Sequence, residues 1–68
     1  IQEVNIMTIT ERKTMENQAY MLISRINTHY EPEVSSSVMT LHGGTPTSVS
    51  SWELEAMLDD LLTIENDR

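Results

Sequence analysis

The chain has 68 residues, no cysteine, and 11 acidic against four basic side chains, which gives a formal charge of −7. This length allows one small domain with a modest core, and the missing cysteines exclude disulfides and thiolate metal sites. The acidic balance disfavours nucleic acid and anionic membrane surfaces, because phosphate binding depends on clustered lysine and arginine. No apolar run approaches the roughly 20 residues of a membrane helix. We therefore expect neither nucleic-acid nor membrane partners, and a reducing compartment, the cytoplasm.

Residues 1–10 are rich in β-branched side chains and leave two interpretations open. Val4, Ile6, Thr8 and Thr10 alternate with other residues, a period that favours a short strand. Alternatively, the segment leads into the helix that follows. Thr8 and Glu11 have the spacing of a capping box, which marks a helix start.

Residues 11–30 are predicted to form a helix. Apolar side chains recur at spacings of four and three, which is typical of a coiled-coil seam. The members of this seam are Met15, Ala19, Leu22 and Ile26, and His29 continues it. Because two heptads are too few for a stable coiled coil, the seam indicates one helix of a bundle or a dimer contact. Pro32 is expected to end the helix.

Residues 31–49 are predicted to be a flexible linker. The segment is rich in serine and threonine and is interrupted by Gly43, Gly44 and Pro46. Such a composition buries too little apolar surface to offset its ordering entropy. Residues 66–68 are polar and are expected to fray. The predicted fold is therefore all-α and partly disordered, with two helices, near 11–30 and 51–65, joined by a Ser/Thr/Gly linker.

Residues 50–65 carry the clearest pattern, an acidic amphipathic helix. Ser50 and Glu53 have capping-box spacing, and the acids of the first turns suit the positive end of the helix dipole. One face is apolar and consists of Leu54, Met57, Leu58, Leu61, Leu62 and Ile64. Trp52, Asp59 and Asp60 lie outside that face. Because so short a helix is marginal in water, the apolar face needs a surface to cover it.

The stretch from Leu54 to Leu61 resembles the LD motif of paxillin and related adaptors, with glutamate where aspartate is typical at the second position. In that family such helices lie in hydrophobic grooves on helical bundles of partner proteins. The resemblance implies a recognition helix anchored by Leu54, Met57, Leu58 and Leu61. Asp59 and Asp60 would then meet basic residues at the rim of the groove.

The order of the predicted elements carries a second resemblance. A helix, a flexible linker and an acidic capped helix together resemble the C-terminal docking segments of modular polyketide synthases. In those segments the early helices dimerise and the last helix docks on the next enzyme. This resemblance implies a dimerising helix at 11–30 and a docking helix at 50–65.

These patterns favour a non-catalytic docking segment whose acidic helix enters a groove on a helical partner, with Trp52 as a further contact. The alternatives are a self-contained homodimeric helical unit, such as a docking or dimerisation domain of a multi-subunit enzyme, and an acidic transactivation or antitoxin-like segment. His29 and His42 lack a third convergent ligand for zinc, and no catalytic constellation is visible. We expect no enzyme activity, no metal and no cofactor.

Overall fold

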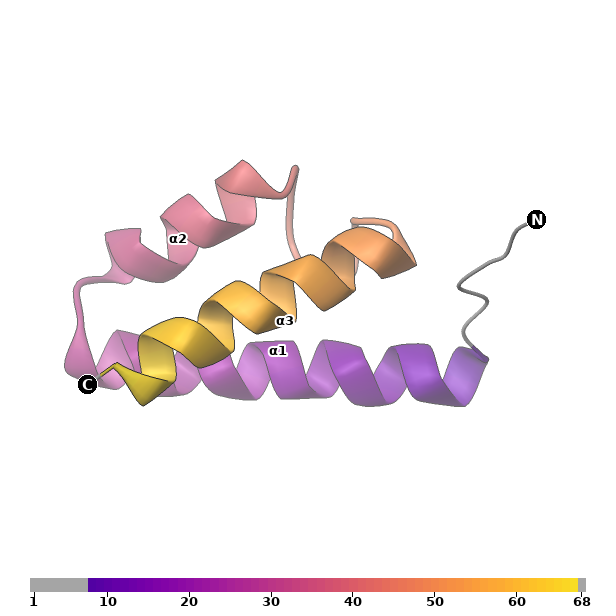
Figure 1. Cartoon of the computed structure of the whole chain (residues 1–68), viewed down its shortest axis with the longest axis horizontal. Coiled ribbons are helices and arrows are strands. Elements are labelled where there is room, and N and C mark those ends of the chain that lie inside the picture. Colours follow the sequence, from indigo (N-terminus) through magenta and orange to yellow (C-terminus); the bar gives the residue numbers. More distant parts are fainter. Residues whose placement is uncertain (1–7, 68) are drawn as a thin grey trace.

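The computed structural model describes residues 8–67 and arranges them as three helices (Figure 1). These are α1 (Ile9–His29), α2 (Pro32–Leu41) and α3 (Ser51–Asn66). Helices α1 and α3 lie side by side and run in the same direction, while α2 runs the opposite way and packs on both. The prediction of an all-α fold is confirmed for the described residues. The possible strand falls largely on residues 1–7, which lie outside them.

Helix α1 begins with the capping box that its sequence predicts. The Thr8 hydroxyl accepts a hydrogen bond from the Glu11 amide at 3.1 Å, and the Glu11 carboxylate accepts one from the Thr8 amide at 3.0 Å. Two amides that the helix itself cannot satisfy are thereby paired. Residues 8–10 therefore belong to the start of this helix, which is the second of the two interpretations of the N-terminal segment.

The predicted linker is wrong over about half of its length, because residues 32–41 form helix α2. Pro32 ends α1 as expected, but it also opens α2, where its missing amide and fixed φ suit the first helical turn. The helix closes in a Schellman motif: the Gly44 amide bonds the Met39 carbonyl, and the Gly43 amide bonds the Thr40 carbonyl. Gly43 has φ 96°, a conformation that glycine adopts readily.

Signals for α2 are present in the sequence, although its serine content is typical of a linker. Val34 and Val38 stand four residues apart, which places both on one face, and Val38 is buried. Ser35 is also buried, and its hydroxyl lies 2.7 Å from the Asn27 side-chain oxygen on α1. A helix start at proline, an i,i+4 apolar pair and a glycine stop together outweigh the low helix propensity of serine.

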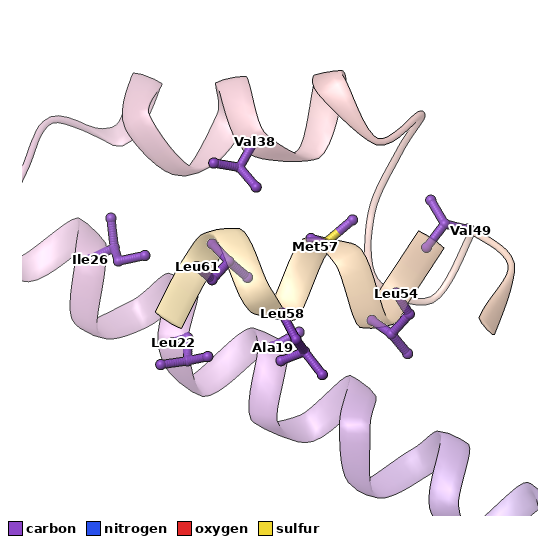
Figure 2. Packing of buried hydrophobic residues seen from close by; sticks show 9 residues of the cluster. All are labelled: Ala19, Leu22, Ile26, Val38, Val49, Leu54, Met57, Leu58 and Leu61. Carbon is purple, nitrogen blue, oxygen red and sulfur yellow. The ribbon is translucent and has the colours of Figure 1, made fainter. Parts of the chain in front are cut away.

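One continuous apolar core lies where the three helices meet (Figure 2). Helix α1 contributes Ala19, Leu22 and Ile26, and α2 contributes Val38. The largest share comes from α3 and the segment before it: Val49, Leu54, Met57, Leu58 and Leu61. A fully buried leucine or isoleucine stabilises a fold by about 1.5–3 kcal/mol, so each large side chain of this core contributes substantially to stability.

Arg12 ties the connection between α2 and α3 to the first turns of α1. Its guanidinium donates to the backbone carbonyls of Pro46 and Val49 and to the Ser51 hydroxyl, the last at 3.1 Å. Its Nε also donates to the Glu16 carboxylate at 2.7 Å. A planar group with several fixed donors suits such a junction. Residues 45–49, predicted to be flexible, are thus held at the N-terminal end of α3.

Candidate protein-docking face

Four of the nine residues predicted to contact a partner are buried within the chain itself. Leu54, Met57 and Leu61 have no exposed surface, Leu58 is 8% exposed, and Ile64 packs against the same core. We call the four buried side chains Leu54, Met57, Leu58 and Leu61 the inner ridge of α3. Figure 2 shows them between α1 and α2. The surface that covers this ridge is therefore provided by α1 and α2, and not by a second protein.

The predicted dimer seam is covered in the same way. Ala19, Leu22 and Ile26 are buried in the core, and Met15 packs partly against it. The seam on α1 and the inner ridge on α3 are the two halves of one intramolecular contact. His29, which continues the seam in sequence, is exposed. A dimer through this seam would require α1 and α3 to separate.

The outer side of α3 carries a different row of side chains. Trp52, Glu55, Asp59 and Leu62 are spaced by three, four and three residues, so they follow one line along the helix. We call these four residues the outer stripe. All are exposed, Trp52 at 63% and Leu62 at 45%. The stripe thus presents an apolar side chain at each end and two carboxylates in the middle.

An apolar groove lies beside the C-terminal part of this stripe. It encloses about 240 Å³ between α1 and α3 and is lined by Gln18, Met21, Leu22, Leu58 and Leu62. Met21 is half exposed and Leu62 nearly so, whereas Leu22 and Leu58 form the floor that continues into the core. Leu62 therefore belongs both to the outer stripe and to the wall of the groove.

The predicted cap of α3 is wrong in its bonding. Ser50 occupies the N-cap position, but its side chain caps no amide. Glu53, its expected partner, instead lies 2.9 Å from His42 Nδ1, and Asp60 lies 2.6 Å from His42 Nε2. His42 follows the last residue of α2, so this pair of contacts fastens the end of α2 to two turns of α3. We call the three residues the His42 clamp.

The His42 clamp favours the doubly protonated imidazole. Both ring nitrogens face carboxylate oxygens, and only the imidazolium donates from both. The hydrogen bond to Asp60, and next that to Glu53, raise the pKa of His42 above its ordinary value, while burial opposes the rise. Asp60, predicted to meet a partner, is thus engaged within the chain. His42 falls in the predicted linker, and its sequence position gives no sign of this role.

Among the described residues, two further kinds of feature are absent: a metal site and a membrane-spanning helix. Between residues 8 and 67, no group of three or more histidine or acidic side chains is arranged to hold a metal ion. In the same part of the chain, no helix has the length and hydropathy needed to cross a membrane. The groove and the outer stripe lie next to each other and form one surface on which contact with another molecule can be built.

Comparisons with known proteins give no relative for this chain: no family model, curated protein or solved structure matches it.

Proposed function

We propose that the chain is a non-catalytic protein-interaction module that binds an amphipathic helix of a partner protein. The partner helix lies along the outer stripe of α3 and places an apolar side chain in the groove beside Met21 and Leu62. The proposal keeps the predicted class of function but moves the contact. The inner ridge serves as core, and the opposite side of the same helix serves as the docking face.

The observation that carries this proposal is the pairing of Met21 and Leu62. These two large apolar side chains, from helices α1 and α3, stay about half exposed across a groove whose floor is apolar. Exposed apolar surface of this kind, rimmed by polar residues, is typical of interaction sites. A groove between two helices that run in the same direction suits a third helix, whose side chains fill it at intervals of three and four residues.

A second copy of the chain is the rival occupant of the groove. The buried core supports a self-contained unit, and the exposed Met21 and Leu62 could meet their counterparts in a homodimer. Each copy carries a charge of −7, however, and this charge opposes self-association. The sedimentation velocity of the intact chain separates the two cases. If the chain is a monomer at 100 μM, the groove is available to another protein. If it is a dimer that Leu62→Ser dissociates, the groove is the contact between two copies.

The docking test uses helical peptides without a chosen charge. A display library that varies every position of a helical scaffold is selected against the full chain, and the isolated binders are measured by calorimetry. We expect dissociation constants near the micromolar range, because the groove is small and the peptide loses entropy on ordering. Binding should weaken at least tenfold with Leu62→Ser or Met21→Ser.

Leu41→Ser is the matched control, because Leu41 on α2 is 74% exposed and lies away from the groove. Circular dichroism of all three variants should match that of the wild type, since each replaces an exposed side chain. Selected peptides that bind the Leu62→Ser and Leu41→Ser variants equally well would show that the groove is not the docking site. If the library yields no peptide that binds the chain, the proposed function is wrong.

A further inference from the structure

The charges around the docking face define the kind of partner more closely, on the condition that the proposed function holds. Helix α3 contains five acidic residues and no basic one. Two of these acids, Glu53 and Asp60, are engaged by His42. The two acids of the outer stripe, Glu55 and Asp59, are exposed, and within residues 8–67 neither carboxylate forms an ion pair. The docking side of α3 thus carries two exposed negative charges, Glu55 and Asp59, that no basic side chain of the described residues neutralises.

The geometry points to a basic amphipathic helix as the occupant: we infer that its lysine or arginine residues meet Glu55 and Asp59 between two apolar anchors. One anchor packs on Trp52 and the other enters the groove at Met21 and Leu62. Trp52 and Leu62 are ten residues apart, about 15 Å along α3 at 1.5 Å per residue. A partner helix that lies along the stripe therefore needs two apolar anchor residues about three turns apart. Its lysine or arginine residues lie on the turns between these anchors.

The same charges orient the partner across the groove. Arg25 stands four residues after Met21 on α1 and is exposed, so a positive charge lies on α1 one turn beyond the groove. Basic residues of the partner consequently belong on the α3 side and not on the α1 side. Complementary charge of this kind raises the rate of association and rejects partners of the wrong sign. An acidic helix with the same apolar face would be rejected.

The test compares two synthetic peptides of 18 residues that share one leucine face and contain no tryptophan. One carries lysine at every polar position, and the other carries glutamate at those positions. Trp52 is the single tryptophan of the chain, so its fluorescence reports contact at the outer stripe directly. We expect the lysine peptide to shift the Trp52 emission to the blue and to bind more weakly as salt rises. The glutamate peptide should do neither.

Two pairs of variants separate specific contact from general attraction to an acidic protein. The double variant Glu55→Gln/Asp59→Gln should weaken binding of the lysine peptide on the order of fivefold. The control Glu31→Gln/Glu33→Gln removes the same amount of charge from exposed positions at the start of α2 and should leave binding nearly unchanged. Leu62→Ser should weaken binding at least tenfold, while Leu41→Ser should not.

Several outcomes overturn the inference and remain distinct from failure of the docking proposal. Equal binding of the two peptides, lost with Leu62→Ser, would keep the docking face and reject the basic partner. An equal effect of the two double variants would mean that the peptide responds to the net charge of the chain and not to Glu55 and Asp59. If neither charged peptide binds while library-selected helices do, the inference fails and the proposed function stands.

Discussion

Leu61 and Leu62 are neighbours on α3 with identical side chains, yet Leu61 is fully buried and Leu62 is 45% exposed. The same contrast runs along the whole helix. The inner ridge is enclosed by α1 and α2, whereas the outer stripe faces away from the core. Sequence periodicity joins both leucines into one apolar face, because they lie only 100° apart around the helix. The structure divides that face into a part that holds the chain together and a part that is available for contact.

The contrast teaches what an amphipathic pattern can and cannot specify. It specifies that a surface must be covered, since a short helix in water depends on packing its apolar face. It does not specify whether the cover belongs to the same chain. Here the cover depends on α2, whose residues resemble a linker by composition, and on the seam of α1, which by sequence suits either a bundle or a dimer. Once α2 forms, the chain can cover its own ridge.

The largest expected effect follows directly from the two leucines. Leu61→Ala should destabilise the fold by about 3 kcal/mol, because it removes a fully enclosed side chain and leaves a cavity. For a domain of this size such a loss lowers the melting temperature by more than about 12 °C and leaves a large unfolded fraction. Urea denaturation followed by circular dichroism measures the loss.

Leu62→Ala is the matched control for that experiment. It changes the same side chain one position further along and should cost less than about 1 kcal/mol, since nearly half of this leucine is already in water. Similar losses for the two variants would mean that the inner ridge and the outer stripe are not distinct. A large loss for Leu62→Ala alone would place the core on the other side of α3.

The second prediction concerns the hydrogen bonds by which Arg12 holds the connection before α3. Arg12→Ala removes the donors to the Pro46 and Val49 carbonyls and to the Ser51 hydroxyl, and we expect a loss of about 2 kcal/mol. Lys13→Ala, an exposed neighbour, should change stability by less than about 0.5 kcal/mol. Hydrogen exchange of the amides in residues 45–50 should accelerate in the first variant only. Unchanged exchange there would show that Arg12 does not hold the connection.

The sequence alone predicts part of this fold and little of the candidate site. The bounds of α1 and α3 follow from the sequence to within a few residues, because capping residues and strong periodicity mark them locally. The bond from Arg12 to the chain before α3 spans 37 residues at Val49 and has no local signature. The His42 clamp is invisible for the same reason: a histidine after a helix is commonplace, and its two carboxylates become neighbours only when α2 folds back on α3. The groove, in turn, arises from side chains of two helices whose register the sequence does not state.

The third prediction is a pH dependence of the folding stability that originates at the His42 clamp. The pKa of His42 is raised in the folded chain, so the stabilisation by the His42 clamp is fully present below the ordinary histidine pKa, about 6.5, while Glu53 and Asp60 are ionised. It is lost as the pH rises through the higher folded pKa. Because Asp60 is 44% exposed, we expect a loss of only about 1 kcal/mol between pH 6 and pH 8.5.

Urea denaturation at both pH values measures this dependence, and His42→Gln is its control. The variant should be less stable at pH 6 and should show a flatter profile, because the remaining histidine, His29, is exposed and forms no ion pair with a carboxylate of residues 8–67. A wild-type stability that rises towards pH 8.5 would contradict the expected sign. An unchanged profile in His42→Gln would assign the dependence to another group.

The smallest effect tests why the capping box of α3 does not form. Ser50→Ala should cost less than about 0.5 kcal/mol, whereas Thr8→Ala, which removes a formed cap on α1, should cost about 1 kcal/mol. In a His42→Ala background Glu53 is free to reach back to the Ser50 amide, and the Ser50 hydroxyl gains its reciprocal role. Ser50→Ala should then cost about 1 kcal/mol as well, a coupling of about 0.5 kcal/mol in the double-mutant cycle. Additive costs would mean that His42 does not compete with Ser50 for Glu53, and that the cap is absent for a reason within the first turn of α3 itself.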